Sequence, residues 1–379
     1  MKNLIRKRDI LNYSKNLEQI HKIKKFPVFM GAVTHPEKED ILSDMIWEIG
    51  TDTGMIQLKK LVPLDVLYQS NHSSGLIGNL WNLHHEKFAK FISKFNPKKV
   101  FEIGGAHGIL AKKYEAFNPN IDWTIIEPNP IPIEGSKAKF IKGFFNENSN
   151  FDLNDSTIIH SHTLEHIYDP NMFLKSISQK VEHNAYQIFS VPNINEMIKR
   201  KYTNGLNFEH TYFLTEEFIK IFLENSGFEI VEKEFFQKDH SIFICAKKNI
   251  NLVKDPNLKK NYYEINKKTF MSYVKYYDDL ISQLNIKISK LNSSVYLFGA
   301  HIFSQYLITN GLKVKKIKSI LDNDPLKKKK RLYGTSLIVD DPLIIKNEDA
   351  PVVILKAGVY TEEIKTQIIN DINKNCIFL

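Results

Sequence analysis

The segment Phe101-Glu-Ile-Gly-Gly-Ala-His-Gly108 decides how this chain folds. It closes an apolar strand candidate and opens a helix. Glycines at such a turn let the backbone pass close to a ligand, and the helix start adds unpaired amides. A dinucleotide-binding turn reads Gly-x-Gly-x-x-Gly, but here Glu102 precedes Gly104 and Gly108 with the spacing Glu-x-Gly-x-x-x-Gly. Glu127 ends the next predicted strand, where an acid can accept both hydrogen bonds from a ribose diol. The pattern predicts a cofactor-binding turn.

The chain around this turn alternates helix and strand patterns from about residue 75 to 250. One strand candidate is 99–104, and four more, 123–127, 139–141, 156–160 and 186–191, are short apolar runs bounded by Gly, Asn or Pro; two further strands follow at 228–232 and 241–246. Such alternation predicts an α/β fold with a parallel sheet covered by helices on both faces. Thr215 is the N-cap candidate of one of these helices, and Gly227 marks its end.

Two further blocks flank this core. The first block combines a polar helical start with two strand candidates, 44–50 and 53–58, whose connection Thr51-Asp52 predicts a hairpin. The last block begins with a long connecting helix, 259–291, and then repeats the α/β pattern in a second, smaller Rossmann-like domain. The expected division is an N-terminal module at 1–74, a core at 75–250, and a connector with the C-terminal domain at 251–379.

Composition narrows the class of protein. With 379 residues, 42% hydrophobic and 25% charged, the chain has material for two or three globular domains. The net charge of +9 is spread along the chain, and its one dense run, Lys327 to Arg331, is expected in a loop, so nucleic-acid binding is not expected. Cys245 and Cys376 lie in apolar runs and are expected to be buried thiols. Without a signal peptide or an apolar span, we expect a cytoplasmic protein that does not enter membranes.

A third motif follows the fourth predicted strand, where the chain reads Ile159-His-Ser-His-Thr-Leu-Glu-His-Ile-Tyr-Asp-Pro170. Together with the glycine turn and Glu127, it resembles the class I S-adenosylmethionine-dependent methyltransferases, which carry a Leu-Glu-His-hydrophobic-x-Asp-Pro segment at this place. The resemblance implies S-adenosylmethionine as cofactor, with Glu102 approaching its methionine end and Glu127 holding its ribose. The other cofactor-binding residues that it implies are Gly104, Gly105, Gly108, Pro128, His162 and Thr163.

These segments have alternative interpretations. The glycine turn could be a tight turn without a ligand, with Glu127 as a surface carboxylate. A histidine on an apolar segment is commonly a core residue, and Zn²⁺ binding competes as an explanation for three histidines within seven positions. No Cys and no further acidic ligand spacing supports a metal, so no metal site is expected.

Asn207-Phe-Glu-His-Thr-Tyr-Phe213 follows the fifth predicted strand. It resembles the Tyr-His-Glu-His-x-x-Tyr-Phe motif of the sugar C-methyltransferases, which act on nucleotide-linked keto sugars and share the three-part organisation. The resemblance implies Glu209 and His210 as the Glu-His pair and His166 as the histidine after the fourth strand. It also implies Tyr68, in the segment 68–75, as a tyrosine that reaches into the active site.

Removing a proton beside a carbonyl requires a base, and an imidazole with a pKa near neutrality suits that task. His210 is therefore the candidate base, oriented or charge-stabilised by Glu209. The alternative is that the two side chains form a surface ion pair on a loop.

The sequence departs from the sugar C-methyltransferase pattern at two places. That family binds Zn²⁺ in its N-terminal module through two Cys-x-x-Cys pairs, but the matching stretches here, Ile10–Tyr13 and Gly50–Thr53, contain no Cys. Hydrophobic packing is expected to hold the module instead. The family's first Tyr-His is replaced by Asn207 and Phe208, which leaves O-methylation of a sugar hydroxyl open beside C-methylation.

The expected function is methyl transfer to a sugar or nucleotide-linked sugar in glycan biosynthesis. Two alternatives remain: an O-methyltransferase for another small phosphorylated metabolite, and a non-catalytic nucleotide-binding partner protein. The expected partner is a small-molecule substrate, and the sequence does not indicate an oligomeric state.

Overall fold

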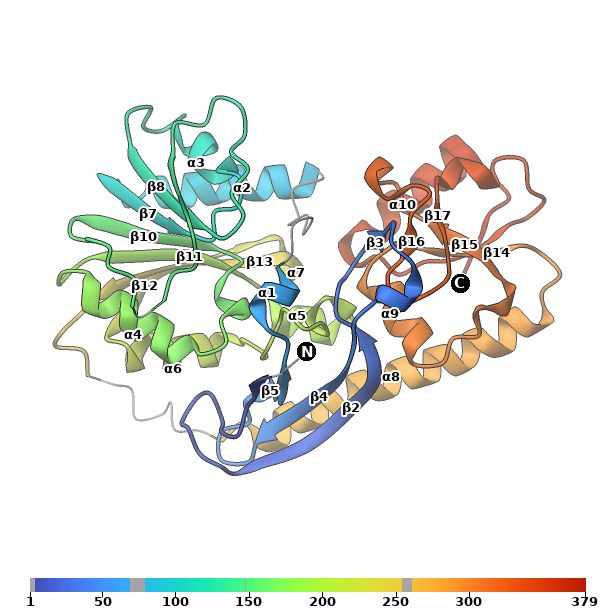
Figure 1. The fold of residues 1–379 in the computed structure, drawn as a ribbon, viewed down its shortest axis with the longest axis horizontal. Coiled ribbons are helices and arrows are strands. Elements are labelled where there is room, and N and C mark those ends of the chain that lie inside the picture. Colours follow the sequence, from blue (N-terminus) through green and yellow to red (C-terminus); the bar gives the residue numbers. More distant parts are fainter. Residues whose placement is uncertain (1–3, 69–78, 147, 254–260) are drawn as a thin grey trace.

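The computed structural model describes residues 4–68, 79–146, 148–253 and 261–379. Seven of the described strands form a central sheet in the order β12-β13-β11-β10-β7-β8-β9 (Figure 1). The strands β7 to β11 run parallel, and β13 runs antiparallel to both of its neighbours. Their bounds are β7 (Lys99–Ile103), β8 (Asp122–Glu127), β9 (Lys139–Lys142), β10 (Ser156–Ser161), β11 (Tyr186–Pro192), β12 (Phe228–Phe236) and β13 (Ser241–Lys248). The seven predicted core strands are confirmed.

Helices cover both faces of this sheet, as the alternating pattern predicts. One face packs on α2 and α3, and the other packs on α4 and α6. The core helices are α2 (Asn79–Ser93), α3 (Ile109–Tyr114), α4 (Pro170–Lys180), α5 (Ile194–Lys199), α6 (Glu216–Asn225) and α7 (Gln237–His240). The predicted N-cap Thr215 accepts a hydrogen bond from the backbone N–H of Phe218. Because strands β7, β8, β10 and β11 are parallel, their carboxyl ends share one edge.

The C-terminal residues contain a separate sheet. Its five described strands are all parallel, in the order β17-β15-β14-β18-β19. The bounds are β14 (Val295–Phe298), α9 (Ile302–Thr309), β15 (Ile317–Leu321), β17 (Val339–Asp340), β18 (Val352–Ile354), α10 (Thr361–Gln367) and β19 (Ile377–Phe378). The long helix α8 (Tyr263–Lys290) precedes it, as predicted, although 254–260 lie outside the described residues.

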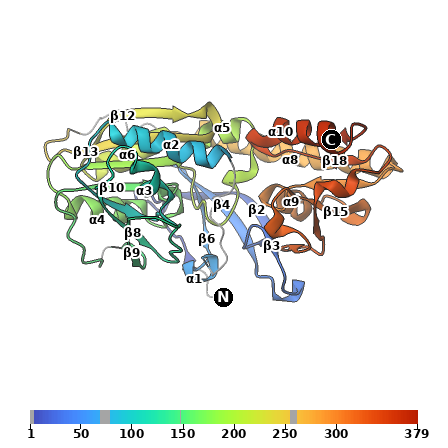
Figure 2. The same ribbon diagram turned by 90° about the horizontal axis from the view of Figure 1, so that it is seen from above.

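The N-terminal residues connect the two sheets. Strands β2 and β4 form a long antiparallel hairpin that runs beside α8 between the core and the C-terminal sheet (Figures 1 and 2). The bounds are β1 (Leu4–Ile5), β2 (Leu17–Pro27), β3 (Ala32–Val33), β4 (Leu42–Gly50), β5 (Ile56–Leu58), β6 (Lys60–Leu61) and α1 (Leu64–Leu67). One hydrophobic cluster contains residues of β2, β4, α8 and β14. The predicted boundary at 74 and 75 lies outside the described residues.

The expected polar helix near the N-terminus is wrong, because the described residues 4–36 form strands and turns. In β2, Ile20, Ile23 and Phe26 are spaced three apart, as on a helix. The pairing of β2 with β4 shifts register between Gln19 and His21 and again between Ile23 and Phe26. These two irregularities let residues three apart face one core, which a regular strand with period two does not allow.

The predicted hairpin of β4 and β5 is confirmed, but its connection is longer than two residues. Strand β5 begins at Ile56 because the backbone N–H of Gly54 donates to Gly50 O and closes a turn, while the Thr53 hydroxyl donates to Asp9 Oδ2 at 2.5 Å. Ser14 also donates to Asp52 Oδ2, at 2.8 Å. The two stretches at which the sugar C-methyltransferases carry zinc-binding cysteines thus lie side by side. Hydrogen bonds join them, in addition to the packing of buried Ile10.

Four of the five basic residues at 327–331 pair with acids, so the run does not form a free cationic loop. Arg331 begins β16 (Arg331–Leu332), which pairs with β3, so the expected loop ends there. The ion pairs are Lys327 with Asp322, Lys328 with Asp341, Lys329 with Asp340, and Arg331 with Asp40. Both cysteines are buried free thiols, as predicted. None of the helices in the described ranges combines the length and apolar composition that a membrane span needs.

Candidate active site

A cavity of about 1370 Å³ opens at the carboxyl ends of the core strands and reaches the C-terminal domain. Its described lining includes all but one of the residues that the sequence singles out: Tyr68, Glu102, Gly104, Gly105, Glu127, Pro128, His162, Thr163, His166, Glu209 and His210. The exception is Gly108, which is the N-cap residue of α3. The rest of the predicted segment at 69–75 lies outside the described residues.

The glycine turn is packed too closely for side chains. Gly104 has φ +74°, and a Cβ built there would lie 2.8 Å from Thr163 Oγ1. Gly108 has φ +81°, and its Cβ would lie 2.9 Å from the ring of Phe140. Both positions combine a left-handed backbone with a close neighbour, so they require glycine. The turn therefore presents bare backbone to the cavity, as a closely approaching ligand requires.

Glu102 lies at the base of the cavity on β7 and is 1% exposed. Trp123 Nε1 donates a hydrogen bond of 2.8 Å to its Oε2. Burial raises the pKa of Glu102 to about 7. The hydrogen bond from Trp123 lowers this pKa, and the nearby charge of Glu127 raises it further. A buried carboxyl with one hydrogen-bond donor is suited to receive a cationic ligand group such as an ammonium.

Glu127 ends β8 and is fixed by two backbone hydrogen bonds. Ala106 N–H donates to its Oε2 at 3.1 Å, and Asn129 N–H donates to its Oε1 at 3.2 Å. The carboxylate is thereby held over the glycine turn, where its remaining lone pairs face the cavity. This geometry can accept two hydrogen bonds from vicinal hydroxyls.

Five side chains that line the cavity lie close together, and we call them the proton-transfer cluster: Tyr68, Glu165, His166, Glu209 and His210. Tyr68 OH lies 2.9 Å from His166 Nδ1. The same His166 nitrogen lies 3.6 Å from Glu209 Oε2, and its Nε2 lies 3.8 Å from Glu165 Oε1. The rings of His166 and His210 meet edge to face with centroids 5.1 Å apart. Segments distant in the sequence thus surround one pair of imidazoles.

His210 is held by its own loop. Asn207 Oδ1 accepts hydrogen bonds from the backbone N–H groups of Glu209, at 2.8 Å, and His210, at 2.7 Å. The ring nitrogen Nδ1 of His210 is buried without a hydrogen-bond partner among the described residues. Burial and then His166 lower the pKa of His210 to about 4, so its imidazole is neutral at pH 7. A neutral imidazole with an unpaired nitrogen can accept a proton.

Glu165 is a residue that the sequence interpretation did not single out, although it lies within the quoted motif. It is 2% exposed, and His162 Nδ1 lies 3.3 Å from its Oε1. Burial alone would raise the pKa of Glu165, but the interaction with His162 and the nearby His166 and His210 lower it to about 2. Glu165 therefore supplies a fixed negative charge beside both imidazoles, which stabilises their protonated forms.

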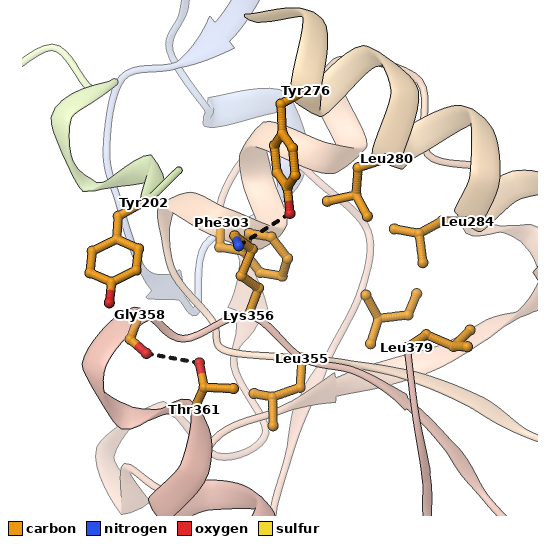
Figure 3. A pocket seen from close by; sticks show the side chains of 11 residues that line it. Tyr202, Tyr276, Leu280, Leu284, Phe303, Leu355, Lys356, Gly358, Thr361 and Leu379 are labelled. Carbon is orange, nitrogen blue, oxygen red and sulfur yellow. Dashed lines mark hydrogen bonds between the residues drawn. The ribbon is translucent and has the colours of Figure 1, made fainter. Parts of the chain in front are cut away.

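The cavity continues onto residues that carried no sequence signal. Phe29, Met30, His301 and Tyr360 line it from the N-terminal module and the C-terminal domain. A second cavity of about 330 Å³ adjoins it, since Tyr202 and Gly358 line both. Figure 3 shows this smaller cavity, where Lys356 Nζ donates to Tyr276 OH at 3.2 Å beside apolar side chains. Only the tertiary structure brings the residues of the N-terminal module and the C-terminal domain to the cavity that the glycine turn also lines.

Among the described residues, two groups of three side chains have the geometry to hold a metal ion. The first group, Glu165, His166 and His210, belongs to the proton-transfer cluster. The second group consists of His84, His162 and His240. In each group the three ligating atoms lie within 4.8 Å of one another.

Residues 81–233 match the family model described as a methyltransferase domain. The chain therefore contains a class I S-adenosylmethionine-dependent methyltransferase domain, with S-adenosylmethionine as the methyl donor. The packed glycine turn, the buried Glu102 and the anchored Glu127 fit this cofactor. No curated protein gives a significant match to the sequence.

Solved structures resemble part of the chain. They include the mitomycin 7-O-methyltransferase MmcR (13% identity, 45% of this chain and 55% of that chain, TM-score 0.36). A SAM-dependent methyltransferase from Aquifex aeolicus is also similar, with 16% identity over 42% of this chain and 89% of that chain and a TM-score of 0.35. The PH0226 protein from Pyrococcus horikoshii OT3 has 11% identity over 49% of this chain and 98% of that chain and a TM-score of 0.38. The chain spans little more than half the length of the first of these relatives.

Proposed function

We propose that the methyltransferase domain of this chain transfers the methyl group of S-adenosylmethionine to a sugar or nucleotide-linked sugar, with His210 as the general base. One observation carries the proposal. A buried, neutral imidazole faces the same cavity as the glycine turn, within a cluster of Tyr68, Glu165, His166 and Glu209. A domain that only bound a nucleotide would have no use for this cluster.

The bound cofactor supplies an electrophilic methyl group on a sulfonium, whose carbon–sulfur bond breaks as the new bond to the acceptor forms. The protein has two tasks in this displacement. Backbone and side chains must hold the acceptor atom in line at about 3 Å, and a base must take the proton that leaves the acceptor. The imidazole of His210, which lines the cavity, takes this proton from a hydroxyl or from a carbon beside a carbonyl. Glu165 and Glu209 stabilise the resulting imidazolium.

The lining of the cavity supports a sugar as acceptor. Its volume of about 1370 Å³ exceeds the roughly 300 to 1000 Å³ of a typical single-ligand pocket, so cofactor and acceptor can bind together. Beyond the proton-transfer cluster, the described wall mixes aromatic rings with hydrogen-bonding groups: Tyr202, Asn204, Asn207, Asp239, His240, His301 and Tyr360. Such a surface suits a ligand with many hydroxyls. The smaller cavity with Lys356 offers room and a cation for a phosphate-linked group.

Analysis of the methylated product tests the proposal, because it shows which class of acceptor is methylated and whether the new bond is to carbon or to oxygen. The protein is incubated with methyl-labelled S-adenosylmethionine and matched pairs of free and nucleotide-linked sugars, including keto sugars. The products are analysed by mass spectrometry and NMR. We expect the label on a sugar. Label on carbon indicates C-methylation, and label on oxygen indicates O-methylation. Label only on a non-sugar phosphorylated metabolite, or on none of these acceptors despite cofactor binding, would refute the proposal.

Replacing Glu127 by alanine should weaken S-adenosylmethionine binding about 10²- to 10⁴-fold. The substitution removes the acceptor of the ribose hydrogen bonds, and hydrogen bonds to a charged group contribute roughly 1.5 to 3 kcal/mol each. It also releases the Ala106 and Asn129 amides that order the turn. Calorimetry measures the dissociation constant, with exposed Glu134→Ala as the control. Unchanged affinity in Glu127→Ala would remove Glu127 from the cofactor site.

The pH dependence of methyl transfer should reflect the low pKa of His210. The base must be neutral, so the rate at saturating S-adenosylmethionine, where the bound cofactor keeps Glu102 ionised, falls as the pH drops through about 4 and stays level from pH 5.5 to 8. The groups facing His210 are His166 and His162, which lower its pKa, and Glu165 and Glu209, which raise it. Rate measurements at constant ionic strength test this expectation. A midpoint near the ordinary histidine value of about 6.5 would contradict it.

A further inference from the structure

Three histidines from distant parts of the sequence meet beside the cofactor cavity. His84 lies on α2, His162 follows β10, and His240 ends α7. The ring centroid of His84 lies 5.2 Å from that of His162 and 5.5 Å from that of His240. The centroids of His162 and His240 are 6.0 Å apart. One ring nitrogen from each lies within 4.8 Å of the other two.

The polar atoms of His84 are unsatisfied. The side chain is 0% exposed, and neither ring nitrogen has a hydrogen-bond partner among the described residues. An unsatisfied buried polar group destabilises a fold by roughly 1 to 3 kcal/mol. Burial, with His162 and His85 adding to it, keeps the pKa of His84 well below its usual value, and burial lowers that of His240 to about 3. Neutral imidazoles have a lone pair available for a metal ion.

The surroundings resemble those of a metal centre. His162 Nδ1 lies 3.3 Å from the buried carboxylate of Glu165. Metal-binding histidines are often oriented by such a carboxylate, which contacts the ring nitrogen that does not bind the metal. The opposite nitrogen, His162 Nε2, lies 2.8 Å from Ser241 Oγ, which also lies 2.6 Å from His240 Nδ1. The ring of Trp81 packs against all three imidazoles, with centroids 4.9 to 5.1 Å away. An apolar ring thus shields one side of the group.

We propose that His84, His162 and His240 bind a divalent transition-metal ion, most suitably Zn²⁺. Imidazole nitrogens favour Zn²⁺ and its neighbours in the periodic table, whereas Mg²⁺ and Ca²⁺ require oxygen ligands. Bonds of about 2.0 to 2.1 Å require the three rings to draw together by small rotations. The hydroxyl of Ser241 lies within hydrogen-bond distance of two of the three imidazoles, those of His162 and His240.

Bound metal would join α2, the loop after β10 and α7 at the wall of the cofactor cavity. It would also fix His162, whose backbone is held at φ +49° beside the glycine turn. The ion therefore has a structural role, and the proposal does not depend on which acceptor the enzyme methylates.

The test uses the full-length protein, stripped with a chelator, without cofactor or acceptor. Calorimetry with Zn²⁺ alone should show one tightly bound equivalent, and Co²⁺ should give the visible absorption of a tetrahedral site. His84→Phe and His240→Phe should each weaken Zn²⁺ binding about a hundredfold or more, because each removes a ligand. Added Zn²⁺ should raise the Tm of the wild type but not that of His84→Phe.

His85→Phe is the matched control, because His85 lies on the same helix and also packs against Trp81 but stands outside the three ligands. It should keep the Zn²⁺ affinity. Far-UV circular dichroism reports whether each variant is folded. The proposal is overturned if the stripped wild type binds no stoichiometric Zn²⁺. It is equally overturned if His210→Ala abolishes binding while His84→Phe does not, since the ion would then occupy the proton-transfer cluster.

Discussion

Replacing His210 by alanine is expected to lower the rate of methyl transfer about 10²- to 10⁴-fold, the range typical for loss of a general base. The affinity for S-adenosylmethionine should stay within about twofold, because the described contacts of His210 are with Asn207 and His166 and not with Glu102 or Glu127. The rate is measured as labelled product formed at saturating cofactor, and the affinity by calorimetry.

Two variants make this result specific. His183→Ala removes an exposed histidine and should leave the rate unchanged. Tyr68→Phe keeps the ring but removes the hydroxyl that lies 2.9 Å from His166 Nδ1, and should cause a smaller loss than His210→Ala. A wild-type rate in His210→Ala would exclude it as the base and would direct attention to His166.

Replacing Arg331 by methionine should destabilise the protein by about 3 to 5 kcal/mol, because it leaves a buried charge without its partner. The Arg331 side chain is 11% exposed and that of Asp40 is 2% exposed. The guanidinium contacts both carboxylate oxygens, at 2.6 and 2.8 Å, and also donates to the backbone oxygens of His35 and Thr335. The pair joins the N-terminal module to the C-terminal domain next to the β3–β16 ladder.

Urea unfolding followed by tryptophan fluorescence measures this loss. Lys329→Met is the control, since its side chain is 81% exposed and its pair with Asp340 should contribute less than about 1 kcal/mol. The double variant Arg331→Met with Asp40→Leu should recover part of the stability, because it removes both buried charges. Equal stability of Arg331→Met and Lys329→Met would show that the buried pair contributes no more than an exposed one.

Much of the fold was predictable because its signals are local. Each core strand is a short apolar run, and each turn is bounded by Gly, Asn or Pro, so the helix and strand pattern can be read from neighbouring residues. Strand β2 was not predictable in this way. Its apolar residues Ile20, Ile23 and Phe26 have a helical spacing, and only the pairing with β4 creates the register shifts that make a strand. The pairing partner lies about twenty residues further along the chain.

The cofactor site shows the same division. The spacing of contiguous residues at 102–108 and of one acid at the end of the next strand predicts the turn and Glu127, whereas Pro128, His162 and Thr163 are implied only by the family resemblance. The proton-transfer cluster was predictable only in part. Tyr68, His166, Glu209 and His210 were named from motif resemblance, but Glu165 was not, because its importance comes from burial beside two imidazoles.

The sequence by itself determined the α/β core and the methyltransferase turn, because both depend on residues close together in the chain. The tertiary structure alone decided three other features. It brings His84, His162 and His240 together. It pairs Arg331 with Asp40, although the sequence predicts a basic loop there. It also places the C-terminal domain against the cavity. The physical reason is that burial and proximity between distant segments set the charge state and partners of a side chain. Neither is encoded in the spacing of its neighbours.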